Sequence, residues 1–126
     1  FTDLPGSSYY FLGGVIAYAN HIKCDLLGVN PKTLSAFGAV SEEVASEMAL
    51  GILSLTGSDW GLATTGIAGP DGGTADKPIG TVWISVADKH KHKASSWKLL
   101  ISSPRSVVRE ETVFAILDQL LGRLSD

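Results

Sequence analysis

The stretch SEEVASEMALGILSLTG, which starts at Ser41 and ends at Gly57, predicts an amphipathic helix over residues 42–56. The Ser41 hydroxyl can cap the first turn, where the helix dipole also favours the carboxylates of Glu42 and Glu43. Gly57 supplies a helix stop. The apolar side chains that recur at helical spacing on one face are Val44, Ala45, Met48, Ala49, Ile52 and Leu53. A helix with one such face requires a second layer to pack against.

Strands and short helices are predicted on both sides of this helix. Upstream, the run at residues 11–18 ends in β-branched and aromatic residues and predicts a strand. Residues 21–27 predict a short helix capped by Asn20, and Pro31 opens another that ends near Gly38. Downstream, the expected elements are a strand at 60–68, a hairpin of strands at 80–87 and 94–101, and a helix that starts at Ser103 and Pro104.

The alternation of strands and helices favours a layered α/β domain. The hairpin adds an antiparallel pair, so we expect a mixed sheet. The final helix is predicted to bury the apolar residues Val107, Val108, Phe114, Leu117, Leu120, Leu121 and Leu124. No repeat, linker or low-complexity tract interrupts the chain, so residues 1–126 are predicted to form a single domain.

Composition argues against several classes of function. A net charge of −3 argues against a nucleic-acid-binding face, which is normally basic. The single cysteine, Cys24, allows neither an intrachain disulfide nor a thiolate metal site, and the three histidines lack ligand spacing. No apolar run approaches the roughly 18 residues that a membrane-spanning helix needs. We therefore expect a cytoplasmic protein with no metal, no nucleic-acid partner and no membrane partner.

The loop TTGIAGPDGGT at residues 64–74 contains four glycines directly after a predicted strand. Glycine allows backbone N–H groups to approach an anion or an oxyanion closely. The loop is neither a P-loop nor a dinucleotide fingerprint, because no Gly-Lys-Ser/Thr follows and no helix opens on it. Its composition indicates a ligand-binding loop, with a long surface turn as the alternative.

Ser8 and Lys23 flank the predicted strand at 11–18 and can form a nucleophile–base pair. The lysine must then lose its proton, which requires burial or a neighbouring cation. The alternative is that Ser8 is a turn residue and Lys23 a solvated helix residue. Spacing alone does not separate the two interpretations.

Several stretches together resemble the CinA C-terminal domain, also known as nicotinamide mononucleotide deamidase. The stretches are DLPGSS at 3–8, GVIAYAN at 14–20, Lys23, LGV at 27–29, GAVSEE at 38–43, TGIAGPDGG at 65–73 and KPIGTV at 77–82. Their order and their spread along the chain make the resemblance specific. It implies a three-layer α/β/α fold around a mixed sheet and a homo-oligomer. The activity it implies is hydrolysis of the carboxamide of nicotinamide mononucleotide, with no cofactor.

The resemblance also implies roles for individual residues. Ser8 matches the family's nucleophile, Lys23 its general base, and Tyr18 a tyrosine that supports the pair. The residues expected to contact the substrate are Asn20, Thr65, Gly66, Gly69, Gly72, Gly73 and Arg105. Arg105 departs from the family pattern, because Ser103 and Pro104 precede it where the family has Gly-Asp.

The family normally carries a first strand and a Glu-Ser-x-Thr-Gly-Gly segment upstream of the DLPGSS stretch. Neither is present in this sequence. We therefore expect the chain to be part of a longer protein, and we expect a sheet without the family's first strand. The alternative to an amidohydrolase is a non-catalytic interaction or assembly domain of a competence- or damage-inducible protein.

Overall fold

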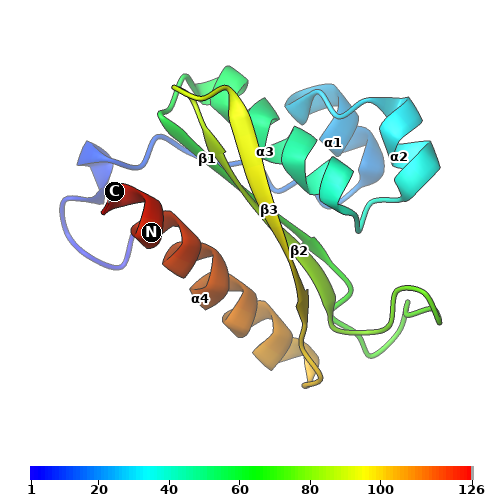
Figure 1. The fold of residues 1–126 in the computed structure, drawn as a ribbon. Coiled ribbons are helices and arrows are strands. Elements are labelled where there is room, and N and C mark those ends of the chain that lie inside the picture. The colour runs from blue at the N-terminus through cyan, green and yellow to red at the C-terminus, as the bar shows by residue number, and fades with distance from the viewer. Residues whose placement is uncertain (126) are drawn as a thin grey trace.

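The computed structural model describes residues 1–125, and it has three layers (Figure 1). The central sheet has the strand order β1-β2-β3 and is antiparallel throughout the described residues. The strands are β1 (Trp60–Gly66), β2 (Thr81–Asp88) and β3 (Lys93–Leu100). The helices are α1 (Asn20–Leu27), α2 (Pro31–Phe37) and α3 (Glu42–Thr56) on one side of the sheet, and α4 (Arg105–Leu124) on the other.

Strand β2 lies at the centre of the sheet and is buried on both faces. Val82, Ile84 and Val86 belong to the cluster under α4, while Ala87 belongs to the cluster under α3. Alternate side chains of a strand point to opposite faces, so one strand anchors both helical layers. A near-continuous buried run is what a strand covered on both sides should show.

Helix α3 forms as its local signals predict. The Ser41 hydroxyl accepts a hydrogen bond from the Val44 N–H at 3.3 Å, and Gly57 ends the helix at a φ of 70°. Gly51 faces α1 so closely that a Cβ there would lie 1.9 Å from the Leu27 carbonyl oxygen. The glycine therefore lets two backbones pack directly against each other.

The three-layer α/β prediction is confirmed, and two details of the sheet are wrong. No parallel pair occurs among residues 1–125, so the sheet described is not mixed. Residues 11–18 form no strand, because no described strand pairs with them. Leu12 is 63% exposed and Ile16 is 92% exposed. A strand requires both β-forming residues and a neighbouring strand for its backbone hydrogen bonds. This segment has the β-forming residues, but no described strand lies beside it to pair with.

The boundaries of α1 and α4 also differ slightly from the sequence expectation. The N-cap of α1 is Ala19 rather than Asn20, and the N-cap of α4 is Pro104 rather than Ser103. Helix termini inferred from sequence are commonly displaced by a residue or two. Neither shift moves a side chain to another layer of the fold.

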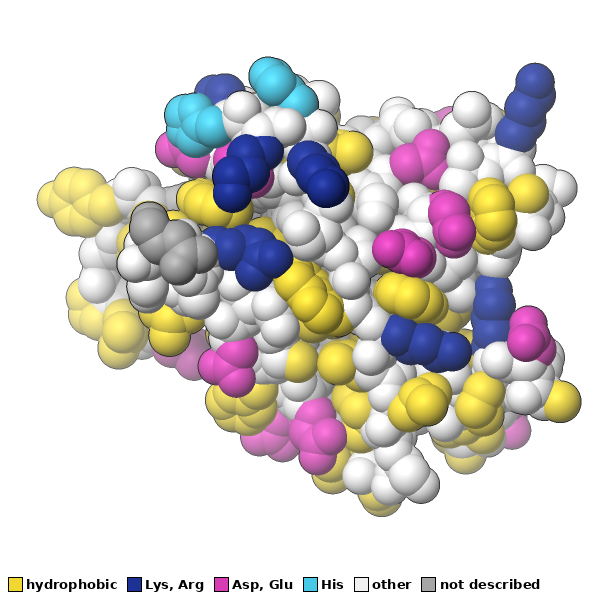
Figure 2. Space-filling view, viewed as in Figure 1, with side chains coloured by type: hydrophobic (Ala, Val, Ile, Leu, Met, Phe, Trp, Pro, Cys, Tyr) yellow, Lys and Arg dark blue, Asp and Glu magenta, His cyan; other side chains and the backbone are white. Residues whose placement is uncertain are grey.

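The predicted buried face of α4 is only partly correct. Val108, Thr112 and Ile116 face the sheet at a spacing of four residues. Phe114, Leu121 and Leu124 are 61%, 63% and 57% exposed, contrary to the expectation of burial. Figure 2 shows apolar side chains open to solvent beside several carboxylates on the side where α4 lies. The helix carries two apolar stripes, and the sheet covers one of them.

The β2–β3 turn presents His90 and His92 to solvent among lysines (Figure 2, top). No helix within residues 1–125 combines the length and the apolar character that crossing a bilayer requires.

Candidate functional site

A cavity of about 390 Å³ opens beside the C-terminal end of β1, between the start of α1 and the N-terminal half of α4. The residues that matter for its chemistry are Tyr18, Asn20, Lys23, Thr65, Gly66, Arg105 and Arg109. Six of these seven are residues that the family resemblance assigned to the site. The fold therefore brings together positions that lie up to 87 residues apart, from Tyr18 to Arg105.

Lys23 is the most unusual side chain in this cavity. It lies in α1 and is only 6% exposed. Its Nζ donates to the Tyr18 carbonyl oxygen at 3.0 Å and to Asn20 Oδ1 at 3.5 Å. Burial lowers the pKa of Lys23 below its ordinary value, with the neighbouring Cys24 acting in the opposite direction. A lysine that gives up its proton more readily can act as a general base.

Tyr18 contributes its backbone rather than its ring to this arrangement. The Tyr18 side chain is 84% exposed, while its carbonyl oxygen holds the Lys23 ammonium group. Asn20 lies in the first turn of α1, three residues before Lys23, so its amide reaches the lysine along one helix face. The segment that ends in Tyr18 and Asn20 thus positions the lysine.

Thr65 and Gly66 form the β1 wall of the cavity. The Thr65 hydroxyl donates to the Ala39 carbonyl oxygen at 2.8 Å, which ties the strand to the loop before α3. A Cβ at Gly66 would lie 2.8 Å from Cγ2 of Val82 on β2. Packing against β2 thus accounts for a glycine at this position.

The last three glycines of the loop, Gly69, Gly72 and Gly73, lie beyond the cavity lining, which ends at Ala68. Gly69 has a φ of 84°, and a Cβ there would lie 2.6 Å from Cγ2 of Ile79. A Cβ at Gly73 would lie 2.8 Å from the same side chain, whereas one at Gly72 would meet only Ile67, at 3.7 Å. Packing on Ile79 accounts for two of the three glycines. The predicted contact of this loop with substrate stays a prediction.

Arg105 connects the loop to the cavity. Its Nη1 donates to the Gly69 carbonyl oxygen at 2.9 Å while the side chain also lines the cavity. Arg109 lies one turn further along α4 and lines the same cavity. Arg109 was not among the site residues predicted from the sequence. Its spacing of four residues from Arg105 is the signal that could have indicated it.

Ser8 lies outside this cavity. It is an exposed residue of the 3₁₀ turn Ser7–Tyr9, which follows Gly6 at a φ of 90°. The chain then runs through residues 11–18 before it reaches Tyr18, and Figure 1 shows the N-terminal turn away from the N-terminal half of α4. Within one subunit the structure does not bring Ser8 next to Lys23.

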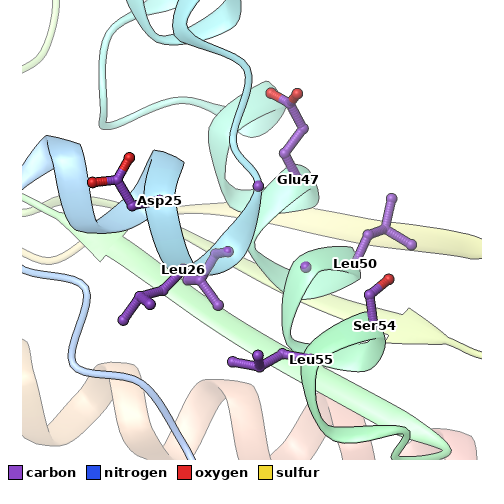
Figure 3. A pocket seen from close by; sticks show the side chains of 9 residues that line it. Asp25, Leu26, Glu47, Leu50, Ser54 and Leu55 are labelled. Carbon is purple, nitrogen blue, oxygen red and sulfur yellow. The ribbon is translucent and has the colours of Figure 1, made fainter.

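A second hollow, of about 520 Å³, lies between α1 and α3 (Figure 3). Leu26, Leu50 and Leu55 give it apolar walls. Oε1 of Glu47 accepts a hydrogen bond from the Asn30 N–H at 3.3 Å, and Oε2 is buried without a partner among the described residues. None of the predicted site residues lines this hollow. Across residues 1–125, no three His, Cys, Asp or Glu side chains group as metal ligands.

Comparison with known proteins gives a consistent result. The model of the CinA C-terminal domain family matches residues 1–124. A CinA-like protein of Gloeothece citriformis is 50% identical over 124 residues, which are 98% of this chain and 30% of that protein. A putative competence-damage inducible protein of Desulforudis audaxviator is 53% identical over 113 residues, which are 90% of this chain and 27% of that protein.

Solved structures agree with these sequence relatives. The crystal structure of competence damage-inducible protein A from Klebsiella pneumoniae superposes with a TM-score of 0.90 at 30% identity, over 97% of this chain and 74% of that one. A competence/damage inducible protein from Agrobacterium tumefaciens gives a TM-score of 0.79 at 37% identity, over 83% of this chain and 64% of that one. The chain spans under a third of the length of the curated relatives named above.

Proposed function

This chain belongs to the CinA C-terminal domain family, and on that premise we propose that it hydrolyses the carboxamide of nicotinamide mononucleotide. The products are nicotinic acid mononucleotide and ammonia. The observation that carries the proposal is the buried Lys23, with its lowered pKa, in a cavity that also contains Asn20, Thr65 and Arg105. A titratable group perturbed by burial in a cavity is a physical reason to expect chemistry there.

Lys23 acts as the general base in this proposal. In its neutral form, Nζ takes a proton from the nucleophile as the latter attacks the carboxamide carbon. The resulting ammonium then returns a proton to the departing ammonia, because an unprotonated amide nitrogen is a poor leaving group. The positively charged pyridinium ring of the bound substrate would favour the neutral lysine further.

The carboxamide oxygen gains negative charge as the tetrahedral intermediate forms. Backbone N–H groups around Gly66, at the end of β1, are the proposed donors to that oxygen. Fixed donors aimed at the developing charge supply a large share of the catalysis in acyl-transfer enzymes. The Gly66 N–H is the proposed donor in particular, because the Ile67 N–H already donates to the Thr81 carbonyl oxygen at 2.9 Å.

Ser8 is the proposed nucleophile, and this role rests on the resemblance of residues 3–8 to the family. Attack by its Oγ expels ammonia and leaves the acyl group on Ser8 as an ester, which a water molecule deprotonated by Lys23 then hydrolyses to the carboxylate product and free serine. Because Ser8 lies outside the cavity of its own subunit, the role requires Ser8 to enter from a second copy or by movement of residues 11–18. A water molecule activated by Lys23 is the alternative nucleophile. Removal of the Ser8 hydroxyl should abolish activity if Ser8 is the nucleophile and should leave it nearly unchanged if water is.

The direct test is ammonia release from nicotinamide mononucleotide by the full-length protein, with the nucleotide product followed by mass spectrometry. The expected product is one mass unit heavier than the substrate, because an NH₂ group is replaced by OH. Release of free nicotinamide instead would mean cleavage of the glycosidic bond, and it would contradict the proposal. An unchanged substrate would contradict it as well.

An assembly role is the second candidate, and the exposed apolar side chains favour it. Tyr9 is 94% exposed and Ile16 is 92% exposed, close in sequence to the exposed Tyr18. Exposed apolar side chains in contiguous patches mark interaction surfaces more often than chance. We expect the full-length protein to form a homo-oligomer, which light scattering measures directly. A monomer at micromolar concentration would contradict this role.

A further inference from the structure

We propose that Arg109 binds the anionic phosphate of the substrate, while Arg105 holds the glycine loop in place. This proposal rests on the proposed function, because it assigns the phosphate end of the same substrate. It concerns a residue that neither the sequence motifs nor the family resemblance singled out. Three observations carry it: the geometry of α4, the hydrogen bonds of the nearby cations, and the charge of the cavity lining.

The geometry places Arg109 on the cavity-facing stripe of α4. Arg105, Val108, Arg109 and Thr112 follow the spacing i, i+3, i+4, i+7, which defines one face of a helix, and all four line the cavity. Val108 is 2% exposed and Thr112 is 8% exposed. These two buried residues fix the rotation of the helix, so the Arg109 side chain emerges at the cavity.

The cationic side chains in and near the cavity differ in whether their N–H groups already donate hydrogen bonds within the protein. Lys23 donates to the Tyr18 carbonyl oxygen and to Asn20, and Arg105 donates to the Gly69 carbonyl oxygen. Lys77, at the other end of the glycine loop, donates to the Phe37 carbonyl oxygen. Among the residues that the structure describes, no side-chain hydrogen bond or ion pair engages the Arg109 guanidinium. Its guanidinium therefore has its donors available for a ligand.

The charge of the lining favours an anionic ligand. Three cationic side chains line the cavity, and no Asp or Glu among the described residues does. The whole chain, by contrast, has 13 acidic residues against 10 Lys and Arg. A cavity with one sign of charge on a protein of opposite net charge concentrates ligands of the complementary sign. A guanidinium can contact two phosphate oxygens at once, which makes arginine well suited to this group.

The arrangement divides the cavity into two ends. The carboxamide would lie at Lys23 and Gly66, and the phosphate would lie at Arg109, with the ribose between them. The volume of about 390 Å³ is within the usual range for small-ligand sites. Arg105, which is tied to Gly69, then acts as a positioning residue that fixes the loop beside the substrate.

The test uses the full-length protein and two substrates that differ only in the phosphate, nicotinamide mononucleotide and nicotinamide riboside. Arg109→Gln is expected to raise KM for the mononucleotide about 10-fold or more, since a charge-assisted hydrogen bond contributes that much. Its kcat should stay within about 3-fold, and the riboside kinetics should not change. Arg109→Lys should recover part of the loss. The matched control is Lys98→Gln, which removes a charge from β3 outside the cavity.

Equal losses for the two substrates, or no loss for either, would overturn the role of Arg109. A second measurement separates this failure from failure of the proposed function. Calorimetric binding of nicotinic acid mononucleotide and of inorganic phosphate is expected to weaken about 10-fold in Arg109→Gln and to stay unchanged in Lys98→Gln. If binding weakens in Arg109→Gln but the unmodified protein releases no ammonia, the anion-binding role of Arg109 stands and the deamidase activity is rejected. Absence of binding to the unmodified protein would reject the site.

Discussion

Lys23 and Ser8 were predicted as one catalytic pair, and the structure places them in very different surroundings. Lys23 is 6% exposed, held by two hydrogen bonds, and its pKa is lowered by burial. Ser8 is an exposed residue in a three-residue turn, at the other end of a segment that pairs with no described strand. The difference teaches that a motif match identifies residue types, while only the fold decides whether two of them share a site.

The largest expected effect is at Lys23. In the full-length protein, Lys23→Met should lower kcat for ammonia release by about 10²- to 10⁴-fold, the usual contribution of a general base. Met keeps the unbranched packing of the buried stem, so the free energy of unfolding should change by less than about 1 kcal/mol. Turnover and denaturant unfolding are measured on the same preparation. Retention of more than a tenth of the activity would remove Lys23 from the mechanism.

The second effect concerns Ser8. If its hydroxyl is the nucleophile, Ser8→Ala should be about as inactive as Lys23→Met, because the two groups act as a unit. Mixing the two inactive proteins under conditions that exchange subunits then tests where the pair forms. Recovery of activity indicates a serine and a lysine from different subunits, and no recovery indicates movement within one. Near-normal turnover in Ser8→Ala would instead assign the attack to water.

A smaller effect separates the glycines of the neighbouring loop. Gly69→Ala combines a positive φ with a Cβ 2.6 Å from Ile79, so it should destabilise the fold by about 2–3 kcal/mol. Gly72→Ala has a positive φ and only an ordinary contact, so about 1 kcal/mol is expected. Urea unfolding measures both. Equal stability with a selective loss of substrate binding would show that the loop serves the ligand rather than the packing.

Sequence reasoning succeeded where the signals are local. The α3 helix was bounded correctly because Ser41 caps one end and Gly57 stops the other within the same stretch. The hairpin was found because β-forming runs flank a short polar turn. Such features depend on neighbours in sequence, which the sequence itself displays.

Sequence reasoning failed where the outcome depends on distant neighbours. Residues 11–18 have strand-forming side chains, yet no described strand supplies the hydrogen bonds. The apolar stripe of α4 that includes Phe114 has helical periodicity, and periodicity does not state which of two stripes meets the sheet. Arg109 was missed for the same reason. It belongs to the candidate site only because the fold places it in the same cavity as Lys23 and Gly66, which are more than forty residues away in the chain.

The central claim is that Lys23 works as a neutral base in the cavity at the end of β1, and the pH dependence of kcat/KM tests it most directly. The profile of the full-length protein reports the free enzyme's essential groups. Lys23 loses its proton as the pH rises. Because burial lowers the pKa of Lys23, this loss occurs at a lower pH than for an ordinary lysine, whose pKa is about 10.4. The account predicts that kcat/KM for ammonia release rises with pH to a plateau, with its inflection below that value. A rate that is flat or falls with increasing pH over the same range would contradict it.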